Sequence, residues 1–90
     1  MSLVRKRVVV RGRVQGVFFR DATQRRASSR SVAGWVTNRP DGVVEAVFEG
    51  EPDAVGSLVE FMREGPRAAD VSEVEVRDEE PEGLSSFDVR

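Results

Sequence analysis

The 90-residue sequence contains neither cysteine nor histidine. Without cysteine there is no disulfide, no thiolate metal site and no thiol nucleophile. Without histidine there is no serine–histidine triad, no histidine–metal catalysis and no histidine general base. Any chemistry of this chain must therefore use arginine, amide, carboxylate and hydroxyl side chains together with backbone N–H groups.

Long apolar runs are missing as well. No stretch approaches the roughly 18 apolar residues of a membrane span, and the basic segment Met1–Arg13 has no apolar core of signal-peptide length. We therefore expect a cytoplasmic protein with no membrane partner. With 39% hydrophobic and 33% charged residues, the chain has room for one core, so we expect a single domain over residues 1–90.

Charge is unevenly distributed along the chain, although the net charge is only −2. Basic residues, nearly all arginine, gather in the first 20 positions, and the second half is acidic. This asymmetry suggests an anionic ligand near the N-terminal half, but two solvated charged faces would give the same pattern.

The pattern in the first half of the chain predicts a strand, a helix and then two further strands. Val-rich Leu3–Val10 is typical of a strand, and Phe19–Arg30 has apolar or small residues near helical spacing. Val32–Thr37 and Val43–Glu49 flank a turn with Pro40 and Gly42. These two runs predict a hairpin.

The second half begins with a strong helix pattern. Apolar residues recur at helical spacing and are followed by the stop signal Gly65–Pro66; they are Val55, Leu58, Val59 and Met62. Val71–Val76 and Phe87–Val89 alternate as short strands around a loop at Glu79–Ser86.

The order βαββαβ, with a short extra strand, predicts an α+β fold. It is the ferredoxin-like sandwich: an antiparallel sheet with two helices on one face and a largely solvated second face. The first two strands of this unit are parallel, with the third between them, so their C-terminal ends lie roughly 10 Å apart. Residues after Val10 and after Val36 can therefore face the same ligand.

Between the first strand and the first helix lies a loop with two glycines, GRVQGVFFR at residues 12–20. Glycines let backbone N–H groups turn inward together, and the first turn of a helix carries N–H donors without partners. A phosphate cradle uses this arrangement, and the Arg20 guanidinium could bind the same oxygens. A plain connection, with Arg20 paired to Asp21, would have the same sequence features.

Asn38 opens the hairpin loop, where asparagine is a common turn residue. Its amide could instead hold a water between the two strand ends, because it offers a donor and an acceptor. The amide takes no proton at neutral pH, so its role would be positioning.

Two segments resemble the signatures of the acylphosphatase family. Residues 12–20 are similar to its Gly-x-Val-Gln-Gly-Val-x-Phe-Arg signature, and Gly34–Asn38, with Asp41–Glu45 and Gly50, resembles the second. Both occur at the family's spacing, and the similarity extends over nearly the whole chain, roughly Arg5 to Arg90.

The resemblance implies a small enzyme that hydrolyses acyl phosphates to a carboxylate and inorganic phosphate, without metal or cofactor. It implies that Arg20 binds the phosphate oxygens and that Asn38 orients the attacking water. It also implies a cradle of backbone N–H groups, from Gln15, Gly16, Val17, Phe18, Phe19 and Arg20. The leaving carboxylate has a conjugate acid with a pKa near that of Glu, about 4.3, so no general acid is needed.

Charge on the transferred phosphoryl group can be stabilised by amides and one arginine. Neither Arg20 nor Asn38 can accept the proton of the water, so we hypothesise that a phosphate oxygen of the substrate accepts it. The chain departs from the family pattern at Thr37, where a basic residue is frequent, and at Ser29–Ser31, where a glycine often ends the helix.

The competing hypothesis is a noncatalytic anion- or phosphate-binding module of the same fold, because such a domain can occur within larger proteins. The last strand lies almost at the end of the chain, which favours an independent enzyme. Nucleic-acid binding is disfavoured, since the polar strand faces lack an aromatic pair and there is no tyrosine.

We expect a monomer without a large exposed apolar patch and a shallow site that accepts many acyl groups. Aromatic and valine residues supply the predicted core, among them Val8, Val10, Phe19, Trp35, Phe48 and Phe61.

Overall fold

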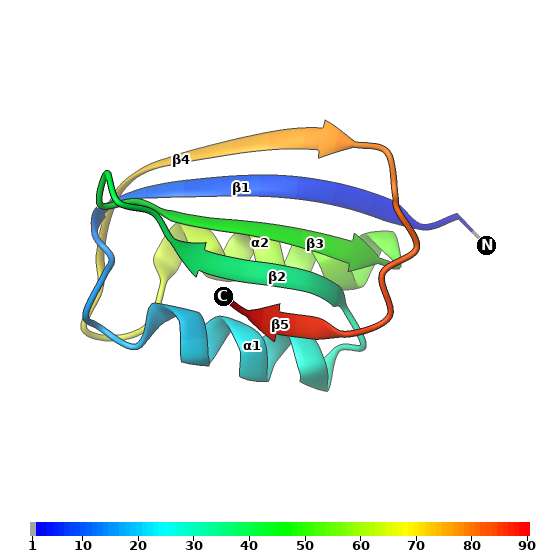
Figure 1. The fold of residues 1–90 in the computed structure, drawn as a ribbon, viewed down its shortest axis with the longest axis horizontal. Coiled ribbons are helices and arrows are strands. Elements are labelled where there is room, and N and C mark those ends of the chain that lie inside the picture. The colour runs from blue at the N-terminus through cyan, green and yellow to red at the C-terminus, as the bar shows by residue number, and fades with distance from the viewer. Residues whose placement is uncertain (1) are drawn as a thin grey trace.

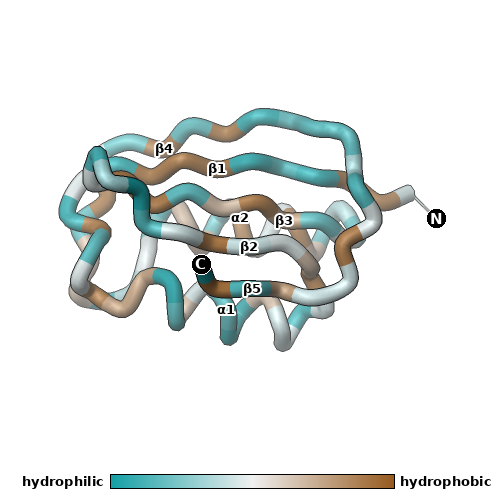
Figure 2. Tube along the Cα trace, viewed as in Figure 1, coloured by the Kyte–Doolittle hydropathy of each residue, from teal (hydrophilic) through white to brown (hydrophobic). Residues whose placement is uncertain are grey.

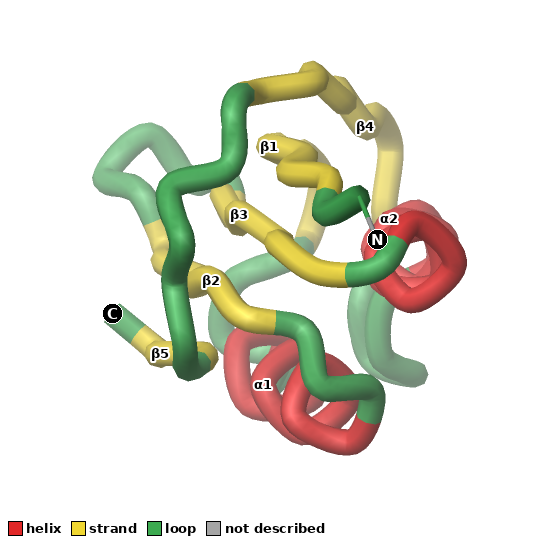
Figure 3. Tube along the Cα trace, turned by 90° about the vertical axis from the view of Figure 1, so that its right-hand side faces the viewer, coloured by secondary structure: helices red, strands yellow, loops and turns green. Residues whose placement is uncertain are grey.

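The computed structural model describes residues 2–90, and its elements follow the predicted order (Figure 1). The strands are β1 (Val4–Arg13), β2 (Ala33–Asn38), β3 (Val44–Gly50), β4 (Asp70–Glu79) and β5 (Phe87–Val89). The helices are α1 (Phe19–Ser29) and α2 (Pro52–Glu64), and both cover the same face of the sheet (Figure 3). The predicted ferredoxin-like α+β sandwich is confirmed. None of the helices within residues 2–90 has the length and apolarity needed to cross a membrane.

The sheet order, β4-β1-β3-β2-β5, brings the ends of β1 and β2 together as predicted. β3 pairs antiparallel with both strands, and Val10 of β1 and Asn38 of β2 are both partners of Val44. The loop that follows β1 and the hairpin that follows β2 therefore leave the sheet at the same edge.

The sheet was predicted to be antiparallel, and it is so except at the short last strand, β5, which pairs parallel with β2. β4 occupies the opposite edge, beside β1, and the loop at residues 80–86 crosses the end of the sheet before β5 begins (Figure 1). Because β4 runs antiparallel to β1 and the crossing reverses the chain, β5 runs in the direction of β1 and β2.

The core lies between the sheet and the helices. Val8, Val10, Phe19 and Phe48 are buried there, as predicted. The helical stripe of α2 is buried too, at Val55, Leu58, Val59 and Met62. Apolar residues concentrate in the central strands, while β4 is mainly hydrophilic (Figure 2).

Trp35 does not pack in the core as predicted, whereas Phe61 packs against its margin. Trp35 alternates with buried Val36, so its ring lies on the other face, where it contacts the guanidinium groups of Arg7 and Arg90 at 5.4 and 4.9 Å. Phe61 is half-buried at the helix layer, with an edge contact to Phe19 at 6.1 Å.

The sheet face opposite the helices is also less solvated than predicted. A charged cluster covers part of it, consisting of Arg5, Arg7, Glu45, Glu49, Glu79 and Glu82. Arg5 is only 4% exposed and donates to Glu49 at 2.6 Å and to Glu79 at 2.8 Å. Glu49 also accepts backbone N–H groups from Glu82, Gly83 and Leu84, which attaches the crossing loop to the sheet.

Helix α1 ends without the glycine that the family pattern has there. Ser31 adopts φ 56° in its place. The Ser31 N–H donates to the Ser28 carbonyl at 3.3 Å and the Val32 N–H to the Ala27 carbonyl at 2.9 Å. This is a Schellman cap, with Ser31 in the position that usually favours glycine.

Candidate active site

The loop between β1 and α1 is shaped by two residues with left-handed backbone. Gly16 has φ 73°, and Phe18, directly before the helix, has φ 62° and ψ 26°. The Phe18 carbonyl accepts the Ala22 N–H at 3.1 Å, and buried Phe19 fixes the start of the helix in the core. The hydrogen bonds within residues 2–90 include no backbone N–H donor between Gln15 and Arg20.

The Gln15 side chain joins this loop to the β2–β3 hairpin. Its Nε2 donates to the Arg39 carbonyl at 2.8 Å and to the Val43 carbonyl at 2.9 Å. Sequence reasoning considered only the backbone of Gln15, because a contact across 24 and 28 residues leaves no local pattern. The side chain holds the two loops of the candidate site together.

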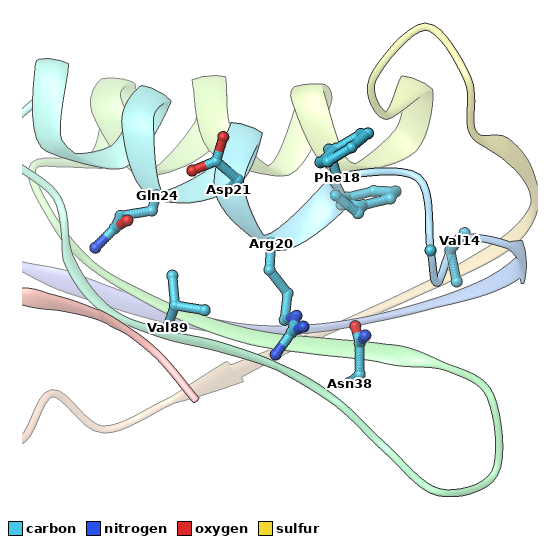
Figure 4. A pocket seen from close by; sticks show the side chains of 9 residues that line it. Val14, Phe18, Arg20, Asp21, Gln24, Asn38 and Val89 are labelled. Atoms are coloured by element: carbon cyan, nitrogen blue, oxygen red, sulfur yellow. The ribbon is translucent and has the colours of Figure 1, made fainter.

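Arg20 and Asn38 meet at a cavity of about 470 Å³ (Figure 4). Arg20 projects from the first turn of α1 and Asn38 from the end of β2, and their polar ends point toward the same space. Of the predicted cradle, Gly16, Phe18 and Phe19 also line the cavity, whereas Gln15 and Val17 do not.

The Arg20 guanidinium is held from one side only. Its Nη1 donates to the Arg90 carbonyl at 3.0 Å, and within residues 2–90 the group makes no other hydrogen bond or ion pair. Arg90 is itself attached to β2, because its N–H donates to the Val36 carbonyl at 2.8 Å. The guanidinium is thus oriented by backbone that follows β5 and keeps N–H donors for an anion.

Asn38 has a buried oxygen without a protein partner. No group within residues 2–90 donates to its Oδ1. A buried acceptor left unpaired costs about 1–3 kcal/mol, so such atoms are rare in folded proteins. The oxygen is in place to accept a hydrogen bond from a molecule in the cavity.

Five further residues line the cavity with side chains that were not part of the predicted site. They are Val14, Phe18, Asp21, Gln24 and Val89. The Asp21 carboxylate also accepts from Arg25 at 2.7 Å, one turn along α1. Val89 had no local signal, because its place depends on the parallel pairing of β5 with β2.

Known proteins match this arrangement along nearly the whole chain. The family model described as acylphosphatase matches residues 6–89. The acylphosphatase of Gloeobacter violaceus is 56% identical over 88 residues, covering 98% of this chain and 95% of the relative.

Two solved structures have the same fold. An acylphosphatase from Coxiella burnetii superposes with a TM-score of 0.93 at 41% identity, covering 98% of this chain and 93% of that one. The acylphosphatase from Bacillus subtilis superposes with a TM-score of 0.92 at 40% identity, covering 97% and 98%.

The protein thus belongs to the class of ferredoxin-like domains, with a cavity between a glycine-containing loop and a β-hairpin. Within that class, the chain belongs to the acylphosphatase family. The family predicted from the two sequence signatures is confirmed.

Proposed function

We propose that this chain hydrolyses the carboxyl–phosphate bond of acyl phosphates at the cavity between the β1–α1 loop and Asn38. Acyl phosphate hydrolysis is the activity of the family to which the chain belongs, and the proposal assigns it to residues. Backbone N–H groups from Gln15 to Arg20 cradle the phosphate. Arg20 binds its oxygens, and Asn38 orients the attacking water.

The assignment rests on one observation. Arg20 and the unpartnered Oδ1 of Asn38 lie at the same cavity. A guanidinium with spare donors stabilises the charge on the equatorial phosphate oxygens. The neutral amide oxygen accepts a hydrogen bond from water and thereby directs the water lone pair toward phosphorus. Binding and orientation thus come from two different elements, α1 and β2.

The reaction needs little proton transfer by the protein. Water attacks phosphorus, the bond between phosphorus and the acyl oxygen breaks, and the electron pair leaves with the carboxylate. That carboxylate is stable unprotonated at neutral pH, because the pKa of its acid is about 4.3. The proton of the water passes to a phosphate oxygen, so the products are a carboxylate and inorganic phosphate.

The test is hydrolysis of benzoyl phosphate, in the presence of a chelator, by the native protein, Arg20→Ala and Asn38→Ala. Each variant should lose about 10² to 10³ in kcat, the usual effect of one lost oriented contact. The matched control is Arg25→Ala, one turn further along α1, whose exposed side chain pairs with Asp21. Circular dichroism checks that every variant is folded.

A folded native protein that binds phosphate without turnover would be the noncatalytic anion-binding module instead. Full activity in Asn38→Ala would contradict its role in orienting water. We further propose that the chain forms a single domain, works as a monomer in the cytoplasm without a cofactor and has no nucleic-acid partner.

A further inference from the structure

Phe18 combines two unfavourable properties. Its side chain is 79% exposed, and its backbone has φ 62°. Left-handed backbone is unfavourable for an ordinary residue, and glycine or asparagine would adopt it more easily. The exposed ring contributes no core burial in return, and the first signature of the family leaves this position open. An unfavoured residue beside a cavity points to a role there.

Exposed apolar side chains gather at the same cavity. Among residues 2–90, the exposed large apolar residues are Leu3, Phe18 and Val89, and the last two line the cavity of Arg20 and Asn38. In Figure 4, Phe18 and Val89 lie on either side of Arg20. Leu3 belongs to a different cavity, beside Ser28 and Phe87.

The cavity is lined by both polar and apolar side chains. Arg20 and Asn38 provide polar groups for the phosphate end of a substrate. Around them, the apolar side chains of Phe18 and Val89 are joined by uncharged Gln24 and by the carboxylate of Asp21. A negatively charged acyl group would lie near that carboxylate, whereas an apolar one would gain contact with the ring and the methyl groups.

We propose that Phe18 and Val89 bind the acyl group, so that the preferred substrates are acyl phosphates with an uncharged apolar or aromatic acyl group. The inference rests on the proposed function, because it takes the phosphate to lie at Arg20. It adds a definite preference to the expectation that the site accepts many acyl groups. Phe18 thereby has two separate roles, its backbone in the loop and its ring at the substrate.

The test compares kcat/KM for benzoyl phosphate with kcat/KM for acetyl phosphate. In Phe18→Ala, the ratio of benzoyl to acetyl phosphate should fall about tenfold relative to the native protein, the lower end of what apolar contacts contribute to selectivity. Val89→Ala should lower it about threefold. Leu3→Ala, which removes an exposed apolar side chain at a different cavity, should leave the ratio unchanged.

Phe18→Gly guards against a folding artefact, because it removes the ring while relieving the left-handed backbone. The ratio should fall in this variant as it does in Phe18→Ala. Ratios within twofold of the native value in both variants would overturn the inference while acyl phosphate hydrolysis stands. A native protein that hydrolyses neither substrate would overturn the proposed function, and the inference with it.

Discussion

At the scale of single residues, the proposed function assigns phosphate binding to Arg20 and water orientation to Asn38, and neither side chain can accept a proton. Asp21 is the carboxylate nearest to this chemistry, since it also lines the cavity. Its oxygen is already bonded to Arg25 at 2.7 Å, and both side chains are exposed. A proton acceptor would need to face the water, so the geometry favours the phosphate oxygen of the substrate.

Asp21→Asn is therefore expected to retain the native dependence of kcat on pH. Amide for carboxylate keeps the size of the side chain and removes the only charge that could act as a base at this position. The measurement is the pH–rate profile for benzoyl phosphate between about pH 3 and pH 9, a range that extends to both sides of the ordinary carboxyl pKa of about 4. A native profile with a carboxyl pKa that disappears in Asp21→Asn would refute substrate-assisted proton transfer.

Residues that touch across the fold were the ones that local patterns could not predict. Arg20 and Asn38 were predictable as neighbours, because each follows a strand whose place in the sheet follows from the element order. The contact of Arg20 with the Arg90 carbonyl was not, since it requires β5 beside β2. Trp35 was assigned to the core by its hydrophobicity, although alternation with Val36 places it on the other face.

At the scale of elements, α1 is bounded at both ends by left-handed residues that are not glycine, Phe18 and Ser31. The first has a proposed role at the cavity. The second only closes the Schellman cap, where the absence of a Cβ would remove the steric cost.

Ser31→Gly should therefore stabilise the protein by about 1 kcal/mol, the lower end of the left-handed penalty. Urea unfolding followed by circular dichroism measures the change, with Ser29→Gly as the control inside the last turn of α1. That control should be destabilising by about 0.5–1 kcal/mol, because glycine is a poor helix former. A loss of stability in Ser31→Gly would contradict the cap.

The strand ends show why the predicted boundaries of the strands differ from those in the structure. β4 was predicted to end at Val76 and continues to Glu79, because its last two residues, Asp78 and Glu79, lie opposite Lys6 and Arg5. Oppositely charged neighbours across strands stabilise a sheet, but in the sequence alone a run of charged residues is typical of a solvated loop. β1 likewise continues past Gly12, where a register shift against β4 follows Arg11.

At the scale of the whole molecule, the charged cluster joins β1, β3, β4 and the crossing loop on the face away from the helices. Hydrogen bonds from Arg7 and Arg5 lower the pKa of Glu79 from 4.5 to about 2. Burial alone would raise the pKa of Glu49, but hydrogen bonds from the Glu82 N–H, from Arg5 and from the Leu84 and Gly83 N–H groups outweigh it and lower the pKa.

These lowered pKa values predict that the folded protein loses stability as the pH falls. The unfolded chain binds protons at Glu79 below about pH 4.5, and the folded protein only near pH 2, so the contribution of this group is complete above pH 4.5 and is lost toward pH 2. Glu79→Gln should reduce stability at pH 7 by about 1–3 kcal/mol and flatten the pH dependence between pH 2 and 4.5.

Urea unfolding at a series of pH values checks this prediction, with Glu80→Gln as the matched control. Glu80 is the next residue along the chain, is exposed, and takes part in no ion pair within residues 2–90. A Glu79→Gln variant with the native slope below pH 4.5 would show that the cluster does not set the acid sensitivity.

The charged cluster also helps to position the candidate site, because it holds the loop that leads into β5. Glu49 holds the loop at residues 82–84, and this loop leads into β5, which places Val89 in the cavity wall and Arg90 against Arg20. The central claim is the proposed phosphate cradle, because the roles proposed for Arg20 and Asn38 both require a phosphate that the loop positions.

Titration of the ¹⁵N-labelled protein with inorganic phosphate, followed by amide NMR shifts, tests that claim most directly. The account predicts saturable shifts centred on the amides from Gln15 to Arg20, retained in Asn38→Ala and abolished or at least tenfold weaker in Arg20→Ala, since a charged contact to phosphate is lost. Saturable binding that leaves these amides unmoved, or that survives unchanged in Arg20→Ala, would contradict it.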